Sequence, residues 1–216
     1  ELILSRTPKD RQTSLFSATI DQSVMKIANK YMRNPLKILV SKDEIALTQM
    51  KQFYTVVNQH SKFDALFSIL SRDEVDKAII FCRTRRETSR ISDQLNRKGL
   101  RVQALHAGFT QAQRDRAISD FRCGRLNLLV ATDVAARGLD IQGITHIINY
   151  DVPMDPLVYF HRIGRTARKG DEGTSITLVS YGEMSDFNNI KALTKTKIEE
   201  VTSAKQDDDS PIKSFY

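Results

Sequence analysis

Residues 77–82 read Lys-Ala-Ile-Ile-Phe-Cys, and residues 127–131 read Asn-Leu-Leu-Val-Ala. Both stretches are short and almost wholly apolar, and polar residues follow each of them at once. Continuous apolar runs of this length are typical of strands that are buried on both faces, as in parallel sheets. The two stretches therefore predict the centre of a parallel sheet.

Other short runs have the same β-rich character, and helical stretches separate most of them. The predicted strands are residues 13–17, 36–40, 53–58, 77–82, 102–105, 127–131, 144–150 and 174–180. Strands that alternate with helices at this spacing form right-handed βαβ units. The chain is therefore predicted to have an α/β fold with a doubly wound, mostly parallel sheet flanked by helices.

Helix start and stop signals follow several of these strands. Thr84 and Thr110 each precede a Glu or Gln by three residues, which is the capping-box pattern. Gly99 and Gly124 stand where the two helices would end. The region 22–33, before an Asn-Pro pair, predicts a further helix.

The domain organisation follows from the polar stretches between these elements. We predict that residues 1–40 are the trailing segment of a preceding domain and that residues 41–49 are a linker. Residues 50–202 contain enough strands for a complete sheet, and residues 203–216, with their acidic run, are predicted to be a flexible tail.

Composition excludes several classes of protein. The 216 residues are 40% hydrophobic, too apolar for a disordered chain, and no apolar run approaches the roughly 20 residues of a membrane span. Two cysteines without a CxxC pair fit neither a disulfide framework nor a zinc site. We expect a reducing compartment, the cytoplasm or the nucleus, and no membrane partner.

The net charge of +7 favours a polyanionic partner, and its distribution is uneven. Residues 83–101 contain seven basic and two acidic residues. Arg162, Arg165 and Arg168 follow one another at intervals of three, so on a helix their guanidinium groups would converge on one side and suit phosphate. The alternative for each cluster is a solvated surface with ordinary ion pairs.

Five motifs occur in a fixed order along the chain. They are residues 17–19 (Ser-Ala-Thr), 78–84 (Ala-Ile-Ile-Phe-Cys-Arg-Thr), 111–114 (Gln-Ala-Gln-Arg), 132–141 (Thr-Asp-Val-Ala-Ala-Arg-Gly-Leu-Asp-Ile) and 161–168 (His-Arg-Ile-Gly-Arg-Thr-Ala-Arg). In this order they resemble motifs III, IV, QxxR, V and VI of the DEAD-box ATP-dependent RNA helicases. The chain resembles the C-terminal RecA-like half of these proteins, and residues 33–54 resemble most the translation-initiation subgroup.

The resemblance implies roles at a nucleotide. Asp140 would accept hydrogen bonds from the ribose, and Gly138 would lie beside the γ-phosphate. Arg165 and Arg168 would stabilise charge on the transferring phosphoryl group, as arginine fingers do. These residues would form the cofactor-binding part of the site.

Three further residues would connect the nucleotide to the rest of the protein. His161 would link motif VI to the first domain and to the RNA-coupled network. Ser17 and Thr19 would couple the state of the nucleotide to closure of the two domains. Considered singly, Ser17 and Thr19 could equally be turn hydroxyls.

A second group of residues would contact RNA through its backbone, without reading bases. The resemblance implies phosphate contacts for Thr84, Arg114 and Thr132, and the basic helix adds Arg85. The family commonly has His-Gly-Asp where residues 106–109 read His-Ala-Gly-Phe, so a close backbone approach is expected at Gly108 instead.

The chain lacks one half of an ATP site. No glycine is followed by lysine, so there is no GxxxxGK[ST] phosphate loop. Residues 73–76 read Asp-Glu-Val-Asp but precede a predicted strand instead of following one, so we interpret them as a solvated loop. ATP with Mg²⁺ is the expected cofactor, with the Mg²⁺ ligands in a preceding domain, and this chain alone is expected to be inactive.

The sequence therefore predicts the C-terminal domain of an ATP-dependent RNA helicase, which unwinds short duplexes or remodels RNA–protein complexes. The expected partners are RNA, an N-terminal RecA-like domain of the same protein, and a scaffold or regulatory protein. Two alternatives remain: a non-catalytic RecA-like module that binds RNA or a regulator, and a DNA helicase of the same superfamily.

Overall fold

The computed structural model describes residues 2–8, 10–17, 22–38, 50–71, 75–139, 141–166, 173–194 and 197–201. Contacts along the chain divide it into two compact units, Glu1–Lys42 and Asp43–Tyr216. No helix among the described residues is long and apolar enough to cross a bilayer.

The first unit contains two helices, α1 (Leu2–Ser5) and α2 (Gln22–Tyr31). The prediction of a strand at residues 13–17 is wrong, because these residues form no strand. Residues 36–38, which belong to the strand predicted at 36–40, form no strand either. A strand needs a neighbour to bond its backbone groups, and the described part of this unit offers none. Its apolar side chains remain largely exposed, Phe16 at 95% and Leu36 at 85%.

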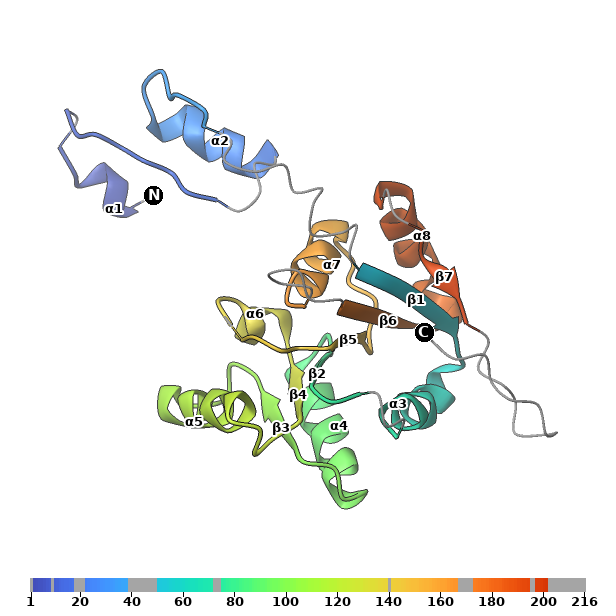
Figure 1. Cartoon of the computed structure of the whole chain (residues 1–216). Coiled ribbons are helices and arrows are strands. Elements are labelled where there is room, and N and C mark those ends of the chain that lie inside the picture. The colour runs from blue at the N-terminus through green and yellow to red at the C-terminus, as the bar shows by residue number, and fades with distance from the viewer. Residues whose placement is uncertain are drawn as a thin grey trace. The chain divides into compact units, whose positions relative to one another are not determined.

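The second unit is built on one seven-stranded sheet (Figure 1). Its strands are β1 (Met50–Val56), β2 (Ala78–Phe81), β3 (Val102–Leu105), β4 (Leu128–Ala131), β5 (His146–Asn149), β6 (Gly173–Val179) and β7 (Glu199–Glu200). Their order is β3-β4-β2-β5-β6-β1-β7, and each described pairing is parallel. The predicted α/β fold with a doubly wound parallel sheet is confirmed.

Helices cover both faces of this sheet. They are η1 (Gln59–Ser61), α3 (Lys62–Leu70), α4 (Arg85–Arg97), α5 (Gln111–Arg122), α6 (Asp133–Ala136), α7 (Pro156–Ile163), η2 (Tyr181–Glu183) and α8 (Met184–Leu193). Alternate residues of β2 enter different cores: Ile80 packs in the cluster of α3 and α4, whereas Ile79 packs in the cluster of α5 and α6. Every residue of β2 is therefore buried, as its apolar sequence predicts.

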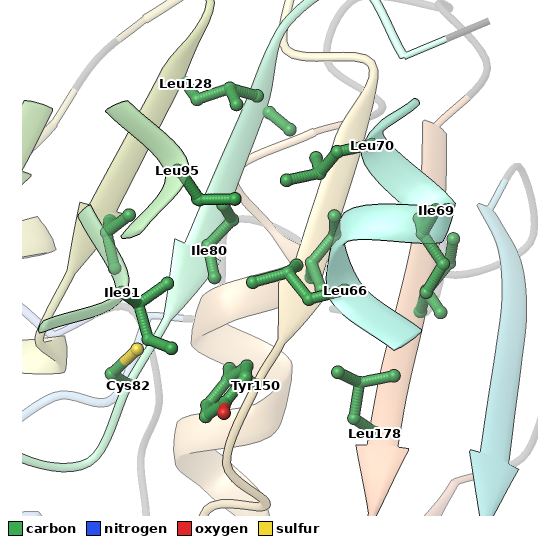
Figure 2. Packing of buried hydrophobic residues seen from close by; sticks show 14 of the residues in the cluster. Leu66, Ile69, Leu70, Ile80, Cys82, Ile91, Leu95, Leu128, Tyr150 and Leu178 are labelled. Atoms are coloured by element: carbon green, nitrogen blue, oxygen red, sulfur yellow. The ribbon is translucent and has the colours of Figure 1, made fainter. Parts of the chain in front are cut away.

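Figure 2 shows the first of these cores at close range. Leu66 from α3 and Leu95 from α4 lie over Ile80 of the central strand, and all three are fully buried. A third cluster joins α7 and α8 to β1 and β6, with Tyr159 and Phe187 among its fully buried residues.

The predicted helix signals are largely confirmed. Thr110 forms a complete capping box with Gln113 at the start of α5. At α4 the Thr84 hydroxyl accepts from the backbone N–H of Glu87, but the Glu87 carboxylate pairs with Arg90 at 2.5 Å. Both helices end before glycines with positive φ, 85° at Gly99 and 77° at Gly124.

One buried histidine makes the stability of the sheet depend on pH. Burial lowers the pKa of His146, at the start of β5, from 6.5 to about 4. His146 therefore stays neutral in the folded state at pH values where the same histidine is already protonated in the unfolded chain.

We expect the free energy of unfolding to fall as the pH is lowered from about 6.5 to about 4, by up to about 3 kcal/mol from His146 alone. Urea unfolding followed by circular dichroism at several pH values in this window measures the slope. The His146→Gln variant should have a shallower slope, whereas His60→Gln, at an exposed position, should keep the wild-type slope. Equal slopes for all three proteins would contradict the assignment.

Candidate functional site

The carboxyl ends of the central strands lie at one edge of the sheet. In the register of the sheet, Phe81 at the end of β2 pairs with Ala131 of β4 and with Asn149 of β5. Leu105 of β3 pairs with the same Ala131. The loops that follow these strands are therefore neighbours, and this edge is where parallel sheets bind ligands.

The loop after β2 leads into the positive end of α4. Thr84 is the N-cap of α4, and Arg85 is its first residue. Both side chains are exposed. A helix N-terminus together with an exposed guanidinium and a hydroxyl favours an anion such as phosphate.

The loop after β3 is attached to α4 through His106. Its Nδ1 accepts a hydrogen bond from the Gly108 N–H at 3.1 Å, so Nε2 carries the proton and donates to the Ser89 Oγ at 2.9 Å. Burial and the nearby Arg85 charge lower the pKa of His106. A Cβ on Gly108 would lie 3.0 Å from the His106 ring, which explains a glycine at this exposed position.

Arg114, on α5, contacts the loop that follows β4. Its Nη2 donates to the Ala135 carbonyl at 2.9 Å and to the Arg137 carbonyl at 3.2 Å. The guanidinium thus braces the segment that contains motif V, a contact that the sequence did not reveal. Its predicted contact with RNA phosphates stays a prediction.

Motif V itself begins at Thr132, the buried N-cap residue of α6. Gly138 follows α6 with a φ of 73°, a left-handed conformation in which side chains other than glycine are strained. This turn presents its backbone without a side chain, as close approach of a phosphate requires. Asp140 lies outside the described residues.

Arg162, in motif VI, is turned into the protein. It is 2% exposed, and its Nε and Nη2 atoms form a bidentate pair with Asp133 at 2.6 and 2.9 Å. Its Nη1 donates to Asn149 Oδ1 and to the Asp151 carbonyl. The expectation that the three arginines converge is therefore wrong for Arg162.

Arg165 has a different environment, because α7 ends at Ile163 and the helical spacing does not continue beyond it. Its Nη1 donates to the Leu139 carbonyl at 3.1 Å, and its Nε donates to the His161 carbonyl at 3.2 Å. The guanidinium thus lies against the motif V loop, next to Gly138 in sequence. His161 is exposed on α7, and Arg168 lies outside the described residues.

The sequence analysis missed an ionic cluster at the same edge, formed by the buried Lys62, Asp151 and Glu183 and by Arg83, whose side chain is 46% exposed. The Lys62 ammonium lies 2.5 Å from Glu183 Oε2 and 3.7 Å from Asp151 Oδ1. Arg83 Nη2 lies 3.4 Å from Glu183 Oε1. The sequence contains only a weak sign of this cluster: Lys62 is the first residue of a helix, where the helix dipole disfavours a cation.

The two carboxylates of this cluster respond differently to burial. Burial opposes ionisation of Glu183, but hydrogen bonds from Lys62 and Ser180 outweigh it, so the pKa of Glu183 is lowered. Burial raises the pKa of Asp151 despite the Arg83 N–H and the Lys62 charge. The shorter contact with Lys62 explains why Glu183 is the better stabilised anion.

Of the two candidate residues in the first unit, Ser17 is exposed, whereas Thr19 lies outside the described residues. Within the described ranges, no three His, Cys, Asp or Glu side chains are grouped so that they could hold a metal ion.

Comparison with known proteins identifies the class of domain. Residues 61–170 match the helicase conserved C-terminal domain. The chain is 40% identical over 208 residues to the DEAD-box ATP-dependent RNA helicase CshA of Bacillus licheniformis, covering 96% of the chain and 43% of that protein. It is 42% identical over 199 residues to CshA of Bacillus subtilis, and this match covers 92% of the chain and 40% of that protein. The chain thus spans less than half the length of these curated relatives.

Solved structures agree with this assignment. S. cerevisiae Dbp5 bound to RNA and ADP BeF3 superposes with a TM-score of 0.83 at 33% identity, over 93% of this chain and 54% of that one. The E. coli DEAD-box protein SrmB, bound to regulator of ribonuclease activity A, gives a TM-score of 0.68 at 34% identity, over 70% and 89%. The chain belongs to the DEAD-box family and contains its C-terminal RecA-like domain.

The different environments of Arg162 and Arg165 predict losses of stability of different size. Arg162→Ala leaves Asp133 without its bidentate partner and should lower the free energy of unfolding by roughly 3 kcal/mol. Arg165→Ala removes hydrogen bonds near the surface and should cost less than about 1 kcal/mol. Urea unfolding of the two variants provides the comparison. Similar losses for both would contradict the structural role of Arg162.

Proposed function

We propose that this chain is the RNA- and ATP-contacting C-terminal half of an ATP-dependent RNA helicase. One observation carries the proposal: motif IV contains β2, motifs QxxR, V and VI follow β3, β4 and β5, and the carboxyl ends of these four strands lie at one edge of a parallel sheet. The curated relatives, which are more than twice as long, support a preceding RecA-like domain in the same protein. The narrower resemblance to the translation-initiation subgroup stays a prediction.

On the RNA side, we propose that Thr84, Arg85 and the first N–H groups of α4 bind backbone phosphates. Gly108, Arg114 and Thr132 would contact the same strand. These groups offer hydroxyls, N–H donors and positive charge, which suits phosphates and carries no information on base sequence. Backbone contacts of this kind also fit local unwinding of many different duplexes.

On the nucleotide side, we propose that Arg165 and Arg168 act on charge that develops during phosphoryl transfer. Gly138 would let the backbone approach the γ-phosphate, and Asp140 would bind the ribose. His161, Ser17 and Thr19 would relay domain closure. Mg²⁺ would neutralise phosphate charge, with its ligands in the preceding domain.

A regulatory protein is a further proposed partner, by analogy with SrmB bound to regulator of ribonuclease activity A.

The RNA contact can be tested in this chain by fluorescence anisotropy with a labelled single-stranded oligouridine. Arg85→Ala should weaken binding about fivefold and reduce the dependence of log K on log salt by about 1, because one phosphate contact is lost. Arg125→Ala makes the same charge change before β4, at the opposite edge of the sheet, and should leave the salt slope nearly unchanged. Equal effects of both variants would favour non-specific attraction.

The catalytic role can be tested in the full-length protein, with this chain alone as a control without turnover. Arg165→Ala should reduce ATP turnover at saturating RNA by at least roughly tenfold and change nucleotide affinity far less. Steady-state turnover and nucleotide titration give the two quantities. Wild-type turnover in Arg165→Ala would favour the alternative, a non-catalytic binding module. Strand displacement on RNA and DNA duplexes separates the RNA helicase from the DNA helicase.

A further inference from the structure

Lys62 is an unusual residue for the place that it occupies. Its side chain is 0% exposed, although an ammonium is costly to bury without partners. It opens α3, where the helix dipole disfavours a positive charge. Among the described residues, its polar partners are Glu183 Oε2 at 2.5 Å, the Tyr150 carbonyl at 2.9 Å and Asp151 Oδ1 at 3.7 Å. The demands of α3 itself therefore do not explain the lysine.

The two carboxylates that Lys62 holds have further bonds to the loop between β2 and α4. Asp151 Oδ2 accepts the backbone N–H of Arg83 at 2.7 Å. Arg83 Nη2 donates to the Val152 carbonyl at 3.0 Å and lies 3.4 Å from Glu183 Oε1. The same Glu183 oxygen accepts the Val152 N–H at 3.2 Å. Arg83 is thus fixed at both its backbone and its side chain.

Arg83 immediately precedes Thr84 and Arg85, which we propose contact RNA. A rotation at Arg83 would redirect the first turn of α4, because α4 begins two residues later. Each polar bond in the chain from Lys62 to Arg83 has a defined direction, unlike apolar packing. The cluster can therefore orient the helix N-terminus as well as bury its own charges.

We propose that Lys62 is a positioning residue, which acts through Glu183, Asp151 and Arg83 to orient Thr84 and Arg85 toward RNA phosphates. This inference rests on the proposed function, because it assigns a task to the proposed RNA contact. Lys62 itself touches no RNA. Its effect on RNA binding should therefore depend on the side chains that it positions.

A double-mutant cycle measures that dependence, with the 216-residue chain and the same labelled oligouridine. Lys62→Met should weaken RNA binding at least about fivefold in the wild-type background. In a Thr84→Ala/Arg85→Ala background the same substitution should weaken it less than about twofold. In an Arg114→Ala background the loss should again be about fivefold, since Arg114 braces a different loop.

Two controls separate positioning from charge and from general stability. The double variant Lys62→Met/Glu183→Gln has the same net charge as the wild type and should show the same loss of RNA affinity as Lys62→Met. If circular dichroism shows that Lys62→Met is unfolded, the double variant replaces it in the test. Phe187→Leu, in the separate cluster of α7 and α8, perturbs a fully buried site and should leave RNA affinity unchanged.

The outcomes separate the two proposals. Wild-type affinity in Lys62→Met and in Lys62→Met/Glu183→Gln, or an equal loss in all backgrounds, overturns the positioning role and leaves the RNA contact standing. If Thr84→Ala/Arg85→Ala itself binds RNA like the wild type, the proposed contact at this loop fails, and the positioning role fails with it.

Discussion

The parallel pairing of the strands is the constraint on which the site depends. Because β2, β3, β4 and β5 point the same way in register, their carboxyl ends meet at one edge of the sheet. Residues as far apart in sequence as Thr84 and Arg162 lie near that edge, where Arg162 reaches Asn149 and Asp151 at the end of β5. An antiparallel neighbour would send its following loop to the opposite edge.

Buried charges then fix the loops at this edge. The Arg162–Asp133 pair ties the start of α6 to α7, and Arg162 also holds the Asp151 carbonyl. Asp151 in turn accepts the N–H of Arg83. Burying such groups costs free energy compared with apolar side chains of similar volume. In return, these groups form directional bonds between the loops.

The sequence predicted those elements whose burial follows from their own local composition. The apolar runs of β2 and β4 and the capping box of Thr110 are such cases. Strand pairings that depend on a partner far away in the sequence could not be predicted. The strand β7 is two glutamates, and it forms because its backbone reaches β1, where Tyr54 donates to Glu200 at 2.8 Å. The strand predicted at residues 13–17 failed for the opposite reason, since no described neighbour accepts its backbone.

Arg162 and Arg165 show why spacing alone could not assign the site. Three residues apart on a continuous helix, they would share a face. The helix ends at Ile163, so the second guanidinium leaves that face and reaches the Leu139 carbonyl, while the first stays with Asp133. A partly accessible guanidinium next to a glycine turn can respond to a ligand, whereas one that is saturated by buried acceptors cannot move without leaving a carboxylate unpaired. Within one motif, burial therefore separates Arg162, which maintains the edge, from Arg165, which stays partly accessible, as its proposed role in phosphoryl transfer requires.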